Sequence, residues 1–165
     1  MSYVFQDDTM GLTPIAQVDA ARRSPQYPGY IAHAVDPVEG GAEFVYLQGV
    51  ANTVKGSLVT YNPLTGATVL AASGAKTGSP VAVAMAAIGA NQFGWYQISG
   101  NALVQKVTGA LSAGASVGVS ATPGSVGTSA GGAATAGALT GAVIGAAAAS
   151  GDATVNVGLS RPIVN

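Results

Sequence analysis

The sequence contains no cysteine and only one histidine among its 165 residues. Without cysteine, the chain forms no disulfide and holds no metal through thiolate ligands. His33 alone does not supply the several donors of a typical zinc site. The lack of cysteine is also typical of a protein made and kept in a reducing cytoplasm. We therefore predict no metal site and no cofactor.

Charge is scarce as well. Only 8% of the residues are charged and the formal net charge is −1, whereas soluble domains average about 25% charged residues. No basic excess attracts nucleic acid. Because few charges accompany a hydrophobic content of 48%, we expect much of the surface to be covered by something other than water. Assembly into a larger object is one such cover.

Signals for export and membrane insertion are weak. The N-terminus MSYVFQDDTM has acidic residues where a signal peptide carries Lys or Arg, and it lacks an apolar core. Residues 107–151 are uncharged, with Gly137, Gly141 and Gly145 spaced as in a membrane helix pair. They include eleven glycines and fourteen alanines, however, and insertion is driven by larger aliphatic residues. We predict neither a secretory leader nor a membrane span.

Alternating apolar and polar residues predict strands in the same C-terminal region. GASVGVSA (114–121) and DATVNVGLS (152–160) both repeat with period two, which is the pattern of half-buried strands. Residues 139–148 and 153–160 are predicted to form a hairpin around the loop SGD. Residues 127–138 are interpreted as a flexible Gly/Ala linker.

Further strand patterns follow one another from Glu43 onward. A turn is predicted at PLTG (63–66), a hairpin at SGN (99–101) and a type II turn at Pro123-Gly124. Together they predict an all-β fold, a small β-barrel or sandwich of about eight to ten short strands. The strand segments are EFVYLQGV, SLVTYN, ATVLAA, SPVAVAMAAI, FGWYQI and ALVQKV.

Two segments carry predictions about burial. In SPVAVAMAAI (79–88), the residues that follow Pro80 alternate large and small apolar side chains over 81–86 without a polar residue, so both faces of this strand are predicted to be buried. Trp95 and Tyr96 are adjacent on a predicted strand and therefore point to opposite faces. We expect one of them in the core and the other at a wall or an interface.

The N-terminal region differs from the rest. The first 43 residues hold eight of the thirteen charged residues and four of the eight prolines. We predict an extended N-terminal arm over residues 1–42 and a β domain over residues 43–165 that folds without it. Residues 13–25 fit a short helix that begins after Thr13 and stops at Ser24-Pro25, or an extended segment.

No catalytic constellation is visible. The chain has neither a phosphate-binding loop nor a GxSxG nucleophile turn. Asp7 and Asp8 are interpreted as a solvated terminus, and His33, with Asp36 three residues later, as a surface or interface residue. Arg22-Arg23 fits either a grip on a carboxylate or phosphate, or a solvated pair. We therefore expect that the protein is not an enzyme.

The order of several segments resembles the decoration, or cement, proteins of tailed-phage capsids. The resemblance rests mainly on GAEFVYLQGVANTVKGSLVTYN, FGWYQISG and the closing GAVIGAAAASGDATVNVGLSRPIV, and it spans about residues 13–164. It implies a compact β domain, usually trimeric, bound outside the major capsid protein shell and stabilising it at capsomer junctions. It implies no catalytic residues.

From this resemblance we expect a structural virion protein, made in the host bacterial cytoplasm and located on the outer capsid surface. Its partners would be the major capsid protein and itself, as a homotrimer, and neither nucleic acid nor membrane. The alternative is another virion component, such as a head-fibre base or a carbohydrate-binding adhesin. The arm is expected to make capsid contacts through Arg22, Arg23, Tyr27, Tyr30 and His33.

Overall fold

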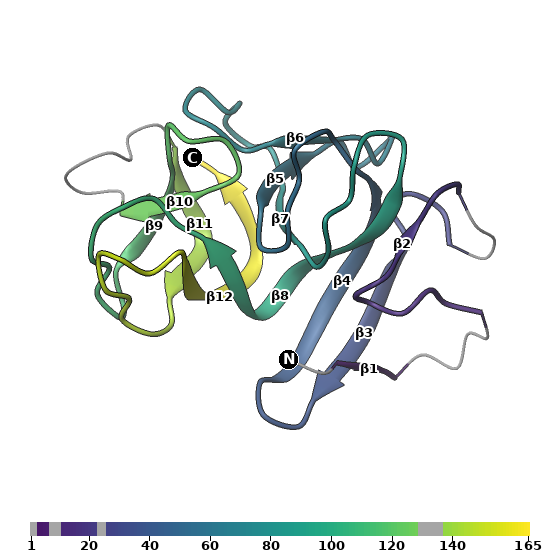
Figure 1. Cartoon of the computed structure of the whole chain (residues 1–165), viewed down its shortest axis with the longest axis horizontal. Helices are drawn as coiled ribbons and strands as arrows, with labels where there is room; N and C mark the ends of the chain where they lie inside the picture. Colours follow the sequence, from purple (N-terminus) through teal and green to yellow (C-terminus); the bar gives the residue numbers. More distant parts are fainter. Residues whose placement is uncertain (1–2, 7–10, 23–25, 129–136) are drawn as a thin grey trace.

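The computed structural model describes residues 3–6, 11–22, 26–128 and 137–165, and these form strands and no helix (Figure 1). The predicted all-β class is confirmed. Within the described ranges, twelve strands join one antiparallel, sandwich-like sheet that is not closed. The strands are β1 (Val4–Phe5), β2 (Val18–Asp19), β3 (Ile31–Asp36), β4 (Gly40–Gln48), β5 (Leu58–Tyr61), β6 (Thr68–Leu70), β7 (Val81–Ala84), β8 (Phe93–Gln105), β9 (Ser116–Val119), β10 (Val126–Thr128), β11 (Ala138–Ile144) and β12 (Thr154–Val164).

Strand β8 connects the two halves of the molecule. Its first half pairs with β4, where Tyr46 lies opposite Trp95, and its second half pairs with β12. The predicted hairpin at SGN is therefore wrong, because β8 runs on through these residues. Gly100 adopts φ 90° there, and a Cβ at this position would lie 2.7 Å from the Gly41 carbonyl oxygen. The glycine thus permits a bend and a close approach within one strand rather than a turn between two.

The core has three clusters, which lie on different faces of the central strands. Phe44 and Trp95 belong to a cluster on one face, whereas Val45 and Tyr96 belong to a cluster on the other. Trp95 and Tyr96 do point to opposite faces, but both side chains are fully buried. The expectation that one of them lies at a wall or an interface is therefore wrong within this chain, because sheet and loops cover both faces of β8.

Strand β7 separates two of these clusters. Val81 and Val83 pack in the C-terminal cluster, while Ala82 and Ala84 pack against Tyr96 and its neighbours. All four side chains are buried. The predicted burial of both faces is confirmed, since a strand without polar side chains is stable when it is enclosed.

The C-terminal half matches its sequence pattern closely. Strands β11 and β12 form the predicted hairpin, and β12 buries Val155, Val157 and Leu159 on one face. The predicted type II turn also forms, with Gly124 at φ 80° and a hydrogen bond of 3.2 Å from Ser125 N to Thr122 O. Most of the predicted linker, residues 129–136, lies outside the described residues, and β10 ends at Thr128 just before it.

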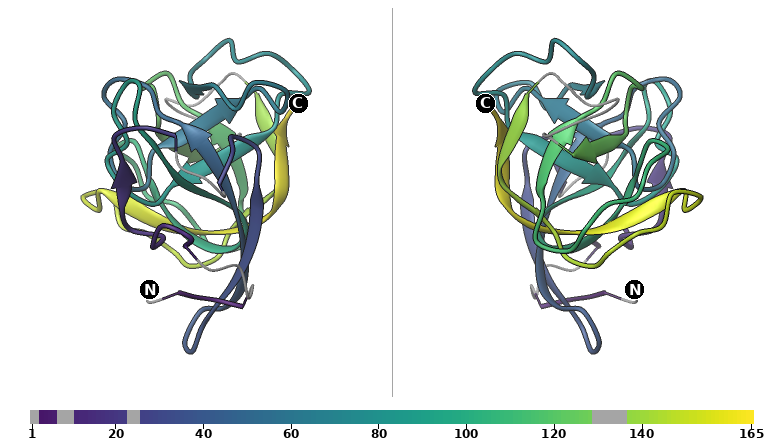
Figure 2. Two further views of the ribbon diagram at one scale, coloured as in Figure 1. Left: turned by 90° about the vertical axis from the view of Figure 1, so that its right-hand side faces the viewer. Right: turned by 90° about the vertical axis from the view of Figure 1, so that its left-hand side faces the viewer.

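The N-terminal segment is extended and packed against the sheet. Residues 11–22 contain a turn at Pro14–Gln17 and the short strand β2, so the extended alternative holds and the helix does not form. Strand β3 pairs along β4, and the predicted boundary between residues 42 and 43 falls inside β4. The hairpin of β3 and β4 projects beyond the rest of the sheet (Figure 2).

Candidate interaction surface

A buried polar network fixes the N-terminal segment in place. The Thr13 hydroxyl donates to Asp19 Oδ2 over 2.6 Å, and the Tyr46 hydroxyl donates to the same oxygen over 2.6 Å. The Thr13 hydroxyl also lies 3.0 Å from Gln26 Oε1, and Trp95 Nε1 donates to the Thr13 carbonyl oxygen over 2.7 Å. Because buried polar groups are costly when unpaired, this network sets the path of the chain on both sides of Arg22.

The next turn lies directly against a turn from another part of the chain. Residues Tyr27–Tyr30 close with a hydrogen bond of 2.8 Å from Tyr30 N to Tyr27 O. Gly66, in the β5–β6 turn, packs so closely on this turn that a Cβ there would lie 2.2 Å from Pro28 Cβ. We call the surface formed by Arg22, Tyr27, Pro28 and Pro63 the double-turn surface.

The aromatic ring and the cation of this surface lie together. The Arg22 guanidinium carbon is 5.7 Å from the centre of the Tyr27 ring, which is within the range of a cation–π contact. Arg22 and Tyr27 are both exposed, Tyr27 to 56%. A flat ring with a guanidinium across it offers apolar area and bidentate hydrogen-bond donors at one place.

The other predicted contact residues are distributed differently. Tyr30 is half-buried, with its ring centre 6.2 Å from that of Trp95, so it supports the turn more than it extends the surface. Arg23 lies outside the described residues. His33 is an exposed residue of β3, and its ring contacts Glu43.

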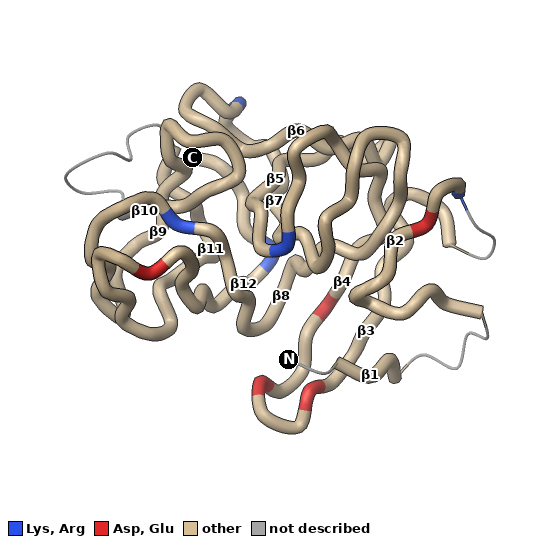
Figure 3. Tube along the Cα trace, in the orientation of Figure 1, with Lys and Arg blue, Asp and Glu red and all other residues tan. Residues whose placement is uncertain are grey.

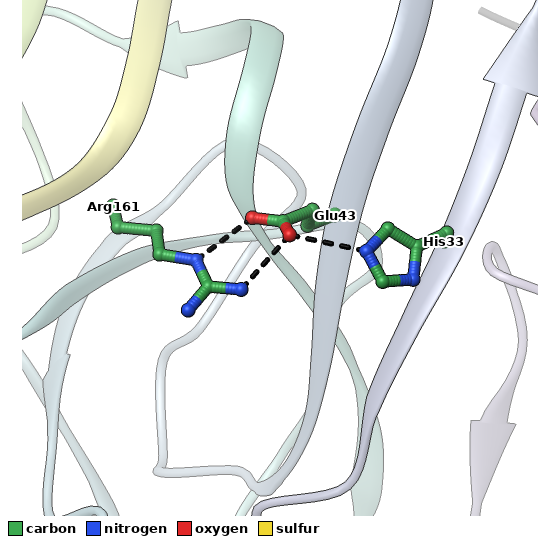
Figure 4. Close-up of polar contacts among 3 residues, drawn as sticks. All are labelled: His33, Glu43 and Arg161. Carbon is green, nitrogen blue, oxygen red and sulfur yellow. Dashed lines mark hydrogen bonds and ion pairs between the residues drawn. The ribbon is translucent and has the colours of Figure 1, made fainter.

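His33, Glu43 and Arg161 form a charged cluster that joins the hairpin to β12 (Figure 4). The Arg161 guanidinium binds both Glu43 oxygens, over 2.9 and 2.8 Å, and His33 Nε2 lies 3.1 Å from Glu43 Oε1. The Arg161 hydrogen bonds lower the pKa of Glu43 against the raising effect of burial. Arg161 holds φ 44°, an unusual backbone conformation for a non-glycine residue. The cluster therefore fastens the hairpin base to the C-terminal strand.

Two further observations concern the titratable groups of the described residues. Burial raises the pKa of Tyr96 to about 12, so its phenol stays protonated inside the core. No three His, Asp or Glu side chains in residues 3–6, 11–22, 26–128 and 137–165 come together as metal ligands. The same residues include no candidate for a membrane-spanning helix.

The chain matches no protein-family profile and no curated protein.

The sequence predicted the ring and the cation of the double-turn surface and the turn at 63–66, but not the packing of that turn against Pro28. The contact between Pro28 and Gly66 joins segments that are far apart in sequence. The sequence feature that could have indicated this contact is the apolar Leu64 within the turn motif NPLTG. In the structure, Leu64 is 93% exposed. An apolar residue inside a strong turn signal is a candidate for surface contact.

Proposed function

We propose that this protein is a structural virion component that binds the outside of a phage capsid and stabilises the shell at capsomer junctions. The double-turn surface is the observation that carries the proposal. It offers an exposed ring and guanidinium on a backbone fixed by the Thr13–Asp19–Tyr46 network. Several sequence segments, and the order in which they occur, resemble those of capsid decoration proteins, and this resemblance supports the same function.

The surface suits contact with a protein shell. Tyr and Arg are enriched where protein interfaces carry most of their binding energy. A ring held by a proline turn loses little conformational freedom on docking, because its backbone is already fixed. Arg22 can bind a shell carboxylate through two parallel hydrogen bonds once water is excluded.

Stabilisation follows from area and repetition. A standard interface buries about 1,600 Å² in total, and many copies on a symmetric lattice multiply weak contacts into strong retention. A protein that touches two capsomers at their junction opposes their separation. We propose that the protein does this as a homotrimer whose partner is the major capsid protein.

The proposal is tested by adding the purified protein to particles from which it has been removed. Electron microscopy should then show added density on the outer shell at capsomer junctions. The refilled particles should retain their DNA on heating to a higher temperature than the stripped ones. Density on the tail or on a fibre, or no binding at all, would refute the proposal.

A further inference from the structure

Two turns of this protein have the same sequence pattern and the same hydrogen bonds. Both begin with Asx-Pro, place an apolar residue third and end on glycine: Asp36-Pro37-Val38-Glu39-Gly40 and Asn62-Pro63-Leu64-Thr65-Gly66. Asp36 Oδ1 accepts from Val38 N and Glu39 N over 2.8 and 3.1 Å. Asn62 Oδ1 accepts from Leu64 N and Thr65 N over 2.9 and 3.4 Å. The closing glycines have φ values of 82° and 70°, so both turns have the same hydrogen bonds and the same left-handed closing residue.

Each turn presents one highly exposed aliphatic side chain. Val38 is 89% exposed and Leu64 is 93% exposed, more than any other large apolar side chain of the described residues. We call residues 36–40 the hairpin tip. Single exposed aliphatic residues are ordinary on protein surfaces, but here two are held by fixed turns, and one of them borders a groove.

The groove lies between the β5–β6 turn and the loop that precedes β7. Leu64 and Val69, the latter 64% exposed, supply its apolar wall, and Lys76 is the one charged residue among the described residues that line it. We call it the Lys76 groove.

Charge distinguishes the hairpin tip from the groove. Asp36 and Glu39 lie in the tip, and residues 26–54 contain no Lys or Arg. Figure 3 shows these acidic positions along the hairpin and basic positions elsewhere on the molecule. An acidic tip with an aliphatic end therefore complements an apolar groove with a lysine on its rim.

The hairpin tip and the β5–β6 region lie at opposite ends of the molecule in both views (Figures 1 and 2). A tip cannot reach the groove of its own chain, so a contact between them joins two copies. Such a contact is heterologous, and it closes into a ring when the rotation between copies allows.

We propose that the hairpin tip of one copy docks into the Lys76 groove of a second copy. Val38 packs against Leu64 and Val69, and Glu39 approaches Lys76. This inference rests on the proposed self-association but does not depend on capsid binding. It is therefore tested on the purified full chain, without particles.

The first experiment measures oligomeric state by analytical ultracentrifugation. The wild type should sediment as an oligomer, whereas Val38→Asp and Leu64→Asp should each weaken association at least about tenfold, since each buries a charge in an apolar contact. Val54→Asp is the matched control, because Val54 is also exposed, to 48%, and lies outside both surfaces. A monomeric wild type, or normal assembly of both variants, overturns the proposal.

The second experiment mixes the two variants. Val38→Asp keeps an intact groove and Leu64→Asp keeps an intact tip, so an equimolar mixture should form dimers with one working contact each. Dimers also show that both variants are folded. A mixture that stays monomeric overturns the head-to-tail contact.

A charge exchange tests the orientation within the contact. Glu39→Lys and Lys76→Glu should each weaken association, and the double variant should recover part of the loss. No recovery overturns the approach of Glu39 to Lys76. If Val38→Asp assembles normally but no longer binds stripped particles, the tip contacts the shell, and the second copy is the wrong occupant.

Discussion

Trp95 donates its indole hydrogen to the backbone carbonyl of Thr13 over 2.7 Å, across 82 positions of sequence. The same tryptophan packs on Tyr46, whose hydroxyl binds the buried Asp19 carboxylate. The N-terminal segment is thus part of the core and also the support of the double-turn surface. The stability of the domain and the geometry of the proposed contact depend on the same bonds.

Removing residues 2–40 is expected to prevent folding of the remaining chain. The deletion takes away β3 and the residues that cover Trp95, and it removes the Thr13 carbonyl that binds the indole and the Asp19 carboxylate that binds the Tyr46 hydroxyl. Because Trp95 is the only tryptophan, its fluorescence reports the outcome directly. Emission at long wavelength and loss of a cooperative urea transition are expected. A blue-shifted spectrum with native-like unfolding would instead support the independent β domain that the sequence predicted.

Tyr46→Phe is expected to destabilise the protein by about 1–3 kcal/mol, because the buried Asp19 carboxylate then loses the hydrogen bond from the Tyr46 hydroxyl. Urea unfolding followed by circular dichroism measures this difference. A variant with wild-type stability would show that water or another group replaces the lost hydroxyl.

Gly66→Ala is expected to cost about 1–3 kcal/mol through its backbone conformation alone, and more through the contact with Pro28. Its φ is 70°, and the added Cβ would meet Pro28 Cβ at 2.2 Å. Gly41→Ala is the matched control, since nothing lies within 4 Å of a Cβ at that position. The control should stay within about 0.5 kcal/mol of wild type. Equal stabilities of the two variants would contradict the close packing of the two turns.

The charged cluster predicts a pH-dependent contribution from Arg161. Hydrogen bonds from Arg161 lower the pKa of Glu43 below its ordinary value of 4.5. A carboxylate with a lowered pKa stabilises the folded state above the unfolded value, and this stabilisation is lost as the pH falls through the folded pKa. Arg161→Ala should therefore lower the urea midpoint at pH 7, and the difference from wild type should shrink as the pH falls below 4.5. An unchanged difference at low pH would show that Arg161 acts by packing or backbone conformation alone.

Period-two patterns predicted much of the fold. The alternation over 153–160 correctly predicted which face of β12 is buried, because Val155, Val157 and Leu159 all lie on the enclosed face of the strand. The hairpin prediction at SGN was wrong because the local sequence does not determine how the strands pair. A glycine marks a bend, but only the pairing of β8 with both β4 and β12 decides that the strand continues.

The candidate site was predictable where its chemistry is local. Arg22 and Tyr27 are close in sequence, and a proline turn beside an arginine pair marks a recognisable surface segment. The pairing of Arg161 with Glu43 spans 118 positions, and the packing of Gly66 on Pro28 depends on two turns meeting in space. Neither contact has a local pattern, so the structure was needed to find them.

The most direct test of the account is the occupancy of variant protein on stripped capsids, measured by electron microscopy at limiting protein concentration. The double variant Arg22→Ala/Tyr27→Ser removes the guanidinium and the ring of the double-turn surface. Its occupancy should fall at least about tenfold, while its urea unfolding and self-association stay close to those of wild type. Val54→Asp, which lies away from this surface, should occupy the shell normally. Full occupancy by the double variant would contradict the claim that this surface binds the capsid.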